Sequence, residues 1–238
     1  MKLKISVVTV SYNAVSTIED TIKSVVNQTY DNIEYIIIDG GSTDGTVDII
    51  KKYSDKISYW ISEPDKGIYD AMNKGILAAT GCYVCFIGAD DTFFSNTSLS
   101  DVEEKLDIQA NCIYYGDVKL RPSGKVYDRN FSLFKLIRKN ICHQAIFYPT
   151  SLLKNHRYSL KYKAYSDYYQ NILFWGMGIK FKYVPITIAN FTIGGFSLKG
   201  DKDFMDDRGG IVFKNLGLIP YVYYLLRVKL VNALKRIL

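Results

Sequence analysis

The sequence predicts an α/β fold, with a mostly parallel central sheet flanked by helices and a helical appendage at the C-terminus. Three observations lead to this fold class. Short β-branched runs alternate with segments of helical periodicity over about the first 90 residues, polar turns follow these runs, and a basic segment with helical spacing ends the chain. Repeated strand–helix–strand order is typical of parallel strands covered by helices.

The first half of the chain supplies the regular part of this fold. Strands are expected where apolar, β-branched residues cluster, at 5–10, 33–38, 57–61 and 83–87. Helices are expected where apolar residues recur three and four apart, around 18–26, 47–53 and 68–76. Ser16 and Glu19 have the spacing of a capping box at the start of the first helix.

The second half is less regular. It predicts strands at 113–118 and 145–148, a hairpin turn at 122–124, and a tyrosine-rich helix at 166–175. No repeat or long linker divides the chain. We therefore expect one main domain over residues 1–205 and a basic, amphipathic helical segment over residues 206–238.

The charge of the chain lies at its C-terminal end. The net charge is +6, and residues 208–238 contain six Lys or Arg and no acid. A basic end on a near-neutral body predicts contact with an anionic surface, whereas nucleic acid would require a basic groove along the body. We therefore expect no nucleic-acid partner.

The last helix has the pattern of a membrane-surface segment. Its charge-free run ends at Leu226, too short for the roughly 20 residues that span a bilayer. Its polar side chains lie within about half of a helical wheel: Arg227, Lys229, Asn232, Lys235 and Arg236. An interfacial helix is the favoured interpretation, and a helix packed on its own domain is the alternative.

The four cysteines indicate a reduced compartment. No secretory signal precedes the first strand, so we expect a cytoplasmic chain with free thiols. Cys82 and Cys85 have metal-like spacing, but residues three apart on a strand point to opposite faces. The pair is therefore not expected to hold a metal.

Polar residues follow three of the expected strands. In a parallel sheet the ligand crevice lies at the carboxyl ends of the strands. The residues at these ends are Thr9, Ser11, Tyr12 and Asn13 after the first strand, Asp39 after the second, and Asp90 and Asp91 after the fourth. A lone Asp after a strand is usually a helix cap, but three clusters at successive strand ends favour a binding site.

The acidic pair predicts a divalent cation. Neither G-x-G-x-x-G nor the P-loop pattern occurs, so a bound diphosphate would need another source of positive charge. The adjacent carboxylates of Asp90 and Asp91 repel each other unless a cation lies beside them. Mg²⁺ or Mn²⁺ prefers such oxygen ligands and can also bind phosphate oxygens.

Three sequence blocks together carry a family resemblance. Residues 5–13, 38–46 and 88–91 resemble, at this spacing, the family 2 glycosyltransferases of the GT-A fold, which is Rossmann-like. The resemblance covers roughly residues 4–200. It implies a glycosyltransferase that uses a nucleotide-sugar donor, typically a UDP-sugar, with a divalent metal.

The resemblance also implies roles for individual residues. Thr9, Ser11 and Asn13 would line the nucleoside pocket, and Asp39 would accept a hydrogen bond from the base. Asp117 would lie near the transferred sugar or the acceptor. The residues of segment 63–75 that would face the nucleotide are Asp65, Lys66, Tyr69 and Asn73. This segment also fits an ordinary turn followed by a helix N-terminus.

The metal site implied by the resemblance has one departure. Asp90 would be the metal ligand and Asp91 would orient the sugar or metal, with His143 near the diphosphate and the metal. Relatives often carry a carboxylate two residues before the metal-binding Asp, where this chain has Gly88. That difference affects the expected ligand geometry.

Asp167 is the expected catalytic base. It resembles the family's acidic position at the start of the helix that faces the acceptor, and inversion requires one carboxylate to remove the acceptor's proton. The alternative is a helix cap, where Asp is favoured. The resemblance implies transfer to a hydroxyl of a glycan or lipid-linked oligosaccharide for bacterial surface polysaccharide, at the inner face of the cytoplasmic membrane.

Two other functions fit parts of the sequence. A sugar nucleotidyltransferase shares the α/β layout and the acid-bound metal, but usually has a Gly-rich basic loop after the first strand, where this chain has 11–14. A non-catalytic membrane-surface module would depend on the tail and not on Asp90 or Asp167. The acids at the strand ends argue against such a module.

Overall fold

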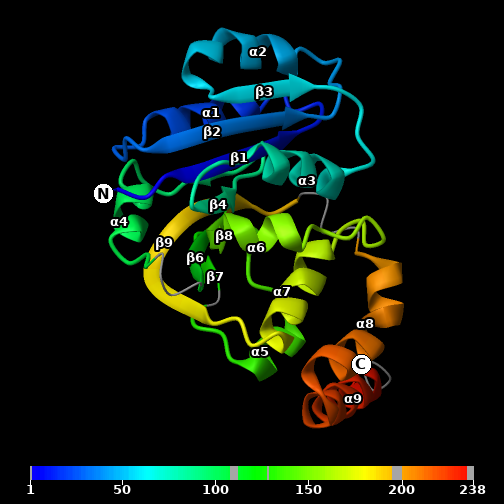
Figure 1. Cartoon of the computed structure of the whole chain (residues 1–238). Helices are drawn as coiled ribbons and strands as arrows, with labels where there is room; N and C mark the ends of the chain where they lie inside the picture. The colour runs from blue at the N-terminus through cyan, green and yellow to red at the C-terminus, as the bar shows by residue number, and fades with distance from the viewer. Residues whose placement is uncertain (1, 108–111, 128, 195–199, 235–238) are drawn as a thin grey trace.

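The computed structural model describes residues 2–107, 112–127, 129–194 and 200–234 (Figure 1). Its sheet has the strand order β3-β2-β1-β4-β8-β6-β9-β5, and β7 pairs with β6. The strands are β1 (Ile5–Ser11), β2 (Ile33–Asp39), β3 (Tyr59–Ser62), β4 (Tyr83–Phe86), β5 (Thr92–Phe93), β6 (Ile113–Arg121), β7 (Val126–Tyr127), β8 (Ile146–Pro149) and β9 (Phe181–Thr192).

The helices are arranged on both faces of this sheet. They are α1 (Ile18–Val26), α2 (Thr46–Lys52), α3 (Ile68–Ala78), α4 (Ser98–Glu103), α5 (Leu133–Arg138), α6 (Thr150–Asn155), α7 (Ser166–Gly176), α8 (Lys202–Leu216) and α9 (Leu218–Leu234). Short 3₁₀ turns lie at Ser54–Lys56 and His143–Ala145. The expected α/β class with helices flanking the sheet is confirmed.

The parallel part of the sheet is its N-terminal half. β2 pairs in parallel with β1 and β3, and β1 pairs in parallel with β4. Ser11 is in register with Asp39, so both lie at the same edge of the sheet. Beyond β4 the sheet is mixed, because β8 runs antiparallel to both β4 and β6 while β9 runs parallel to β6.

Two apolar cores lie on opposite faces of the sheet. Alternate residues of β1 divide between them, with Val8 on one face and Val7 on the other. The first core packs α3, α6, α7 and α8 against the sheet, and the second packs α1, α2 and α4. The parallel strands, and with them their carboxyl ends, thus lie between two layers of helices that pack on opposite faces of the sheet.

The capping box expected at Ser16 and Glu19 does not form. Helix α1 begins at Ile18 after Thr17, which makes no side-chain cap. The Glu19 carboxylate instead accepts hydrogen bonds from Lys52 at 2.8 Å and from the Tyr53 hydroxyl at 2.7 Å. These contacts, that of Lys52 first, lower the pKa of Glu19 to about 2. Tertiary contact with the end of α2 has replaced the local cap.

The C-terminal helices α8 and α9 lie beside α5 and α7, at the end of the molecule away from α2 (Figure 1). The expected boundary between residues 205 and 206 falls within α8, whose Phe204 is fully buried. No helix in the described ranges is long and apolar enough to cross a membrane. Lys235, Arg236 and the side chain of Asn232 lie outside the described residues.

No disulfide joins the four cysteines, all of which lie in the described part of the chain. Cys85 is buried in β4, and Cys82 precedes that strand and is partly exposed. Within residues 2–107, 112–127, 129–194 and 200–234, no group of three or more His, Cys, Asp or Glu side chains is placed to hold a metal.

Candidate active site

A cavity of about 1420 Å³ opens at the carboxyl ends of β1, β2 and β4. Its walls come from the strand ends, from the N-terminal turn of α3, from residues 138–144, and from the starts of α7 and α8. Seven of the expected site residues line it: Ser11, Asn13, Asp65, Tyr69, Asp90, His143 and Asp167. Residues that are far apart in sequence thus share one space.

Asp39 organises the turn at the strand ends. Its carboxylate is fully buried and accepts five hydrogen bonds, at 2.6–3.1 Å, from the hydroxyls of Ser11, Ser42 and Ser62 and from the amides of Gly41 and Ser42. Burial alone would raise the pKa of Asp39, but these donors outweigh it and lower the pKa. Asp39 does not line the cavity, and both of its carboxylate oxygens already accept hydrogen bonds from the protein. In this arrangement it is therefore not placed to accept a hydrogen bond from a nucleotide base.

The loop after β1 is tied to the same turn. The Asn13 amide donates to the Ser42 hydroxyl at 2.8 Å, and the Thr43 amide donates to the Asn13 side chain at 3.0 Å. Asn13 has a φ of 49°, which Asn tolerates better than most residues. Thr9 lies behind this loop, fully buried and 3.2 Å from the Tyr35 hydroxyl, and does not line the cavity. Of the three residues expected in the nucleoside pocket, Ser11 and Asn13 line the cavity and Thr9 does not.

Some residues of the segment before and within α3 line the cavity, and others hold the fold together. Asp65 lines the cavity and accepts from the Gly67 amide at 2.7 Å. Lys66 is exposed and lies outside the lining. Asn73 exchanges two hydrogen bonds of 2.9 Å with the backbone of Tyr158, so it fixes α3 to the chain before α7. In this arrangement neither Lys66 nor Asn73 lines the cavity in which a nucleotide was expected.

The acidic pair after β4 has one exposed and one buried member. Asp90 lines the cavity, whereas Asp91 is 1% exposed and accepts from Gln144 at 2.7 Å and from the Thr192 amide at 2.9 Å. Burial and then the charge of Asp90 raise the pKa of Asp91 to about 6. A Cβ atom at Gly88 would lie 3.0 Å from Asp90 Oδ1 and 2.9 Å from Asp91 Oδ2. The glycine thus leaves open the space that the two carboxylates share.

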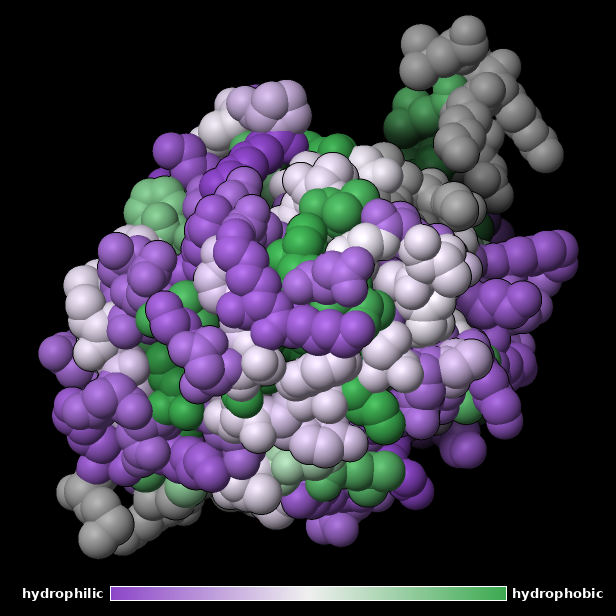
Figure 2. Space-filling view, turned by 90° about the horizontal axis from the view of Figure 1, so that it is seen from above, coloured by the Kyte–Doolittle hydropathy of each residue, from purple (hydrophilic) through white to green (hydrophobic). Residues whose placement is uncertain are grey.

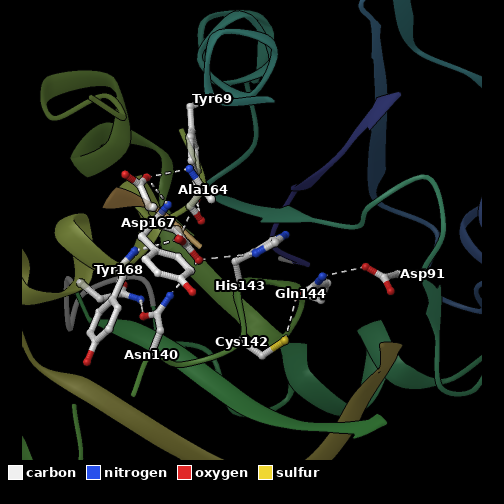
Figure 3. Close-up of polar contacts among 12 residues, drawn as sticks. Tyr69, Asp91, Asn140, Cys142, His143, Gln144, Ala164, Asp167 and Tyr168 are labelled. Carbon is white, nitrogen blue, oxygen red and sulfur yellow. Dashed lines mark hydrogen bonds and ion pairs between the residues drawn. The ribbon is translucent and has the colours of Figure 1, made fainter. Parts of the chain in front are cut away.

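Asp167 lies at the centre of a hydrogen-bond network (Figure 3). Its Oδ1 accepts from the Tyr69 hydroxyl at 2.7 Å and from the Tyr168 amide at 2.8 Å, and its Oδ2 accepts from Asn140 at 2.8 Å. The N-cap residue of α7 is Tyr165, which makes no side-chain cap. Asp167 accepts from one first-turn amide of this helix, that of Tyr168, and also from two side chains outside the helix, so a contact of the helix-cap type and the contacts at the cavity wall occur together.

His143 connects Asp167 to the acidic pair. Its Nδ1 lies 3.5 Å from Asp167 Oδ2. Burial alone would lower the pKa of His143, but the contact with Asp167 and the charges of Asp91 and Asp90 outweigh it and raise the pKa. Next to it, Gln144 bridges the Cys142 thiol and Asp91. Asp167 and Asp91 therefore each contact one residue of the 142–144 segment.

Asp117 is remote from this network. It lies on β6 at a register shift, accepts from the Tyr183 hydroxyl at 2.9 Å, and does not line the cavity. Its Oδ1 is buried with no hydrogen-bond partner among the described residues. In this arrangement Asp117 therefore contacts β9 and not the cavity.

Sequence reasoning missed Asn140, Tyr168 and Arg208, which all line the cavity. Asn140 and the Tyr168 amide donate to Asp167, and Arg208 donates to the Tyr168 hydroxyl. No local pattern marks them, because each becomes relevant through contacts across 27 residues or more. Gln144 is different, since it directly follows His143 in the His-Gln step. That step was a signal from which Gln144 could have been predicted.

Comparison with known proteins identifies the family of this chain. Residues 6–173 match glycosyl transferase family 2. A PGL/p-HBAD biosynthesis glycosyltransferase of Mycobacterium bovis is 32% identical over 209 residues, covering 84% of this chain and 82% of that protein. An uncharacterized glycosyltransferase, Rv1514c of Mycobacterium tuberculosis, is 35% identical over 159 residues, 63% of this chain and 60% of that protein. The match and the fold together define a glycosyltransferase. The chain belongs to glycosyl transferase family 2.

Solved structures share the fold. S. aureus TarS 1–349 in complex with UDP-GlcNAc gives a TM-score of 0.72 at 20% identity, covering 90% of this chain and 67% of that one. The mannosyltransferase PcManGT from Pyrobaculum calidifontis, in complex with GDP-Man and Mn²⁺, gives 0.66 at 17% identity, covering 82% of this chain and 59% of that one. The chain spans 43% of the longer TarS structure. These likenesses confirm the expected GT-A fold.

Proposed function

We propose that this chain transfers a sugar from a UDP-sugar to a hydroxyl of a glycan or lipid-linked acceptor, with inversion at the anomeric carbon. The observation that carries the proposal is the shared cavity of Asp90 and Asp167. Asp90 lies at the strand ends, where nucleotides bind in α/β sheets, and Asp167 lies on the facing helix. The TarS structures in complex with UDP and UDP-GlcNAc support a uridine nucleotide.

The strand-end part of the cavity would hold the nucleoside. Tyr12 lines the cavity and is 67% exposed, unusual for a large aromatic side chain, and its ring lies beside Gly40. An exposed ring at a cavity mouth suits stacking against a base. Ser11, Asn13 and Asp65 would offer polar contacts to the ribose and base, while Asp39 would act by holding the turn.

The acidic pair would hold Mn²⁺ or Mg²⁺. The residues fit such a cation, because Asp90 is exposed in the cavity and its Oδ1 lies, together with Asp91 Oδ2, beside the position that a Cβ atom at Gly88 would occupy. When bound, the cation would offset the charge that develops on the leaving diphosphate. With Nδ1 beside Asp167, His143 would hold the cation or a phosphate oxygen through Nε2.

Asp167 would act as the base. The acceptor oxygen forms a bond to the anomeric carbon, the bond from that carbon to the UDP oxygen breaks, and the acceptor proton moves to the Asp167 carboxylate. UDP leaves with the bonding electron pair. Tyr69, Asn140 and the Tyr168 amide keep the carboxylate in one orientation during this transfer.

Calorimetry and donor turnover test the two carboxylates separately. UDP is titrated into the wild type, Asp90→Ala and Asp167→Asn with and without Mn²⁺, and UDP release is measured with a panel of UDP-sugars. We expect Mn²⁺-dependent binding in the wild type and Asp167→Asn, its loss in Asp90→Ala, and loss of turnover in both variants. Undiminished turnover in Asp167→Asn would exclude it as the base, and absence of UDP binding would exclude the uridine donor.

Pyrophosphate release from a nucleoside triphosphate and a sugar phosphate would support the nucleotidyltransferase instead.

We also propose that α9 binds the inner face of the cytoplasmic membrane. It exposes a set of apolar side chains: Leu218, Ile219, Val222, Leu225, Leu226, Val228, Leu230, Val231 and Leu234. The same segment is basic and contains no acid. The face seen from above Figure 1, around α2 and β3, is by contrast mostly hydrophilic (Figure 2). Apolar surface beside basic charge suits an anionic lipid surface.

Vesicle co-sedimentation tests this contact. Leu226 is 62% and Leu230 60% exposed, so replacing both with Asp should abolish binding to phosphatidylglycerol vesicles without unfolding the protein. Leu77→Asp is the matched control, because Leu77 is 56% exposed on α3. Equal sedimentation of the double variant and the wild type would contradict the proposal, and phosphatidylcholine vesicles separate the charge contribution from the apolar one.

A further inference from the structure

Arg208 of α8 lies where four helices meet. Its Nη2 donates to the Ile137 carbonyl at 2.6 Å and to the Tyr168 hydroxyl at 2.6 Å. Its guanidinium carbon lies 5.0 Å from the ring centre of Tyr168, 5.9 Å from that of Phe204 and 5.8 Å from that of Tyr224. These contacts join α8 to the end of α5, the start of α7 and the middle of α9.

The two groups that accept from Arg208 are adjacent to the groups that hold Asp167. Tyr168 directly follows Asp167 and donates its amide to the Asp167 carboxylate. Ile137 is three residues before Asn140, which donates to the other oxygen of Asp167. The Tyr168 hydroxyl also donates to the Leu136 carbonyl at 2.5 Å, which closes the link between α5 and α7. Arg208 therefore fastens both segments that orient this carboxylate.

The surroundings of Arg208 favour a geometric role over a stabilising one. Among the described residues no carboxylate forms an ion pair with it, and its Nε is buried without a hydrogen-bond partner. A partly buried cation with only neutral acceptors and aromatic rings costs desolvation free energy that these contacts only partly offset. Arg has a rigid planar fork, so it can fix two acceptors and a ring at once.

We propose that Arg208 is a positioning residue, which couples the C-terminal helices to Asp167 by holding Tyr168 and the 137–140 segment in place. The proposal rests on the proposed function of Asp167 as the base. Arg208 lines the cavity beside Met205, and its hydrogen bonds to described residues go to Met205, Ile137 and Tyr168, not to the ends of β1, β2 and β4. Its loss should therefore affect turnover more than donor binding.

The experiment compares Arg208→Gln, Arg208→Lys and Lys202→Gln in the full chain. Lys202 is the matched control, since it lies on the same helix, is 85% exposed and pairs only with Asp206 among the described residues. For UDP-sugar turnover we expect kcat to fall at least about tenfold in Arg208→Gln, with the donor KM within about twofold of the wild type. Arg208→Lys keeps the positive charge and can still donate a hydrogen bond, so its kcat should lie between those of the wild type and Arg208→Gln. The kcat of Lys202→Gln should match that of the wild type.

A second measurement needs no substrate. The chain has two histidines, so histidine-labelled protein gives few NMR signals. His143 contacts Asp167, whereas His156 packs 5.9 Å from Phe174 further along α7. We expect the His143 signals to move in Arg208→Gln and to stay in Lys202→Gln, with His156 unchanged in both.

The possible results separate the positioning role of Arg208 from the proposed role of Asp167 as the base. An unchanged His143 signal with wild-type kcat in Arg208→Gln would show that Arg208 does not position the base. A rise in donor KM at constant kcat would make it a binding residue instead. If Asp167→Asn keeps full turnover while His143 moves in Arg208→Gln, the proposed base fails and Arg208 still positions Asp167. The melting temperature of each variant separates these effects from unfolding.

Discussion

The hydroxyl of Tyr69 lies 2.7 Å from Oδ1 of Asp167, although 98 residues separate the two in sequence. The same hydroxyl lies 3.0 Å from the Ala164 carbonyl. Burial, and then the charge of Asp167, raise the pKa of Tyr69 well above its ordinary value, so it remains a donor at neutral pH. This contact fixes the carboxylate from the side of α3.

Replacing Tyr69 with Phe should therefore lower turnover of the donor about tenfold and leave UDP binding within about twofold, because the carboxylate loses one of its orienting donors. Steady-state kinetics and calorimetry measure the two effects. Tyr53→Phe is the control: its hydroxyl also lies 2.7 Å from a carboxylate, that of Glu19, but outside the cavity. Equal loss of turnover in both variants would show that the effect is not specific to Asp167.

Tyr12→Ala should weaken UDP binding by about tenfold, since a stacked base contributes about 1–3 kcal/mol. Titration calorimetry with Mn²⁺ measures the change. Tyr59→Ala is matched to it, because Tyr59 is 46% exposed on the edge strand β3 and does not line the cavity. If both variants bind UDP as the wild type does, the base does not stack on Tyr12.

Glu34→Gln should destabilise the fold in a pH-dependent manner. Burial alone would raise the pKa of Glu34, but hydrogen bonds from Ser6, Thr80 and Lys4 outweigh it and lower the pKa to about 2. We expect a loss of about 2 kcal/mol in the free energy of unfolding at neutral pH, as for hydrogen bonds to a charged group.

The sign of the pH effect follows from the lowered pKa. The stabilisation from the ionised Glu34 is fully present above the ordinary value of 4.5 and disappears as the pH falls toward about 2. Urea titrations at several pH values should show the wild type and Glu34→Gln converging over that range. A difference in stability that does not change with pH would indicate that the charge of Glu34 is not responsible.

Two glycines of the C-terminal region should respond in opposite ways to alanine. A Cβ at Gly176, the last residue of α7, would lie 2.3 Å from the Asn215 carbonyl oxygen of α8, so Gly176→Ala should force α7 and α8 apart at a cost of about 1–3 kcal/mol. A Cβ at Gly210 within α8 meets nothing within 4 Å, so Gly210→Ala should stabilise the helix by about 0.5–1 kcal/mol. Thermal unfolding measures both, and a stable Gly176→Ala would show that the helices can separate freely.

Some features of the site were predictable because they are local. Asp90 follows a buried strand, and parallel strands bring their carboxyl ends to one edge, so its place in the cavity follows from sequence order. Ser11 and Asp39 were expected at that edge for the same reason, and their register confirms it. What Asp39 does there was not predictable, because its serine and amide partners come from three separate segments.

The sequence by itself determined the α/β class, the parallel N-terminal strands and the polar strand ends, because hydrophobic periodicity and turn residues are local signals. Only the tertiary structure decided that Glu19 binds the end of α2 instead of capping α1. It alone placed Tyr69, Asn140 and Arg208 around Asp167 and its neighbour. Such contacts depend on how helices pack across the sheet, and packing joins residues whose sequence separation carries no periodic signal.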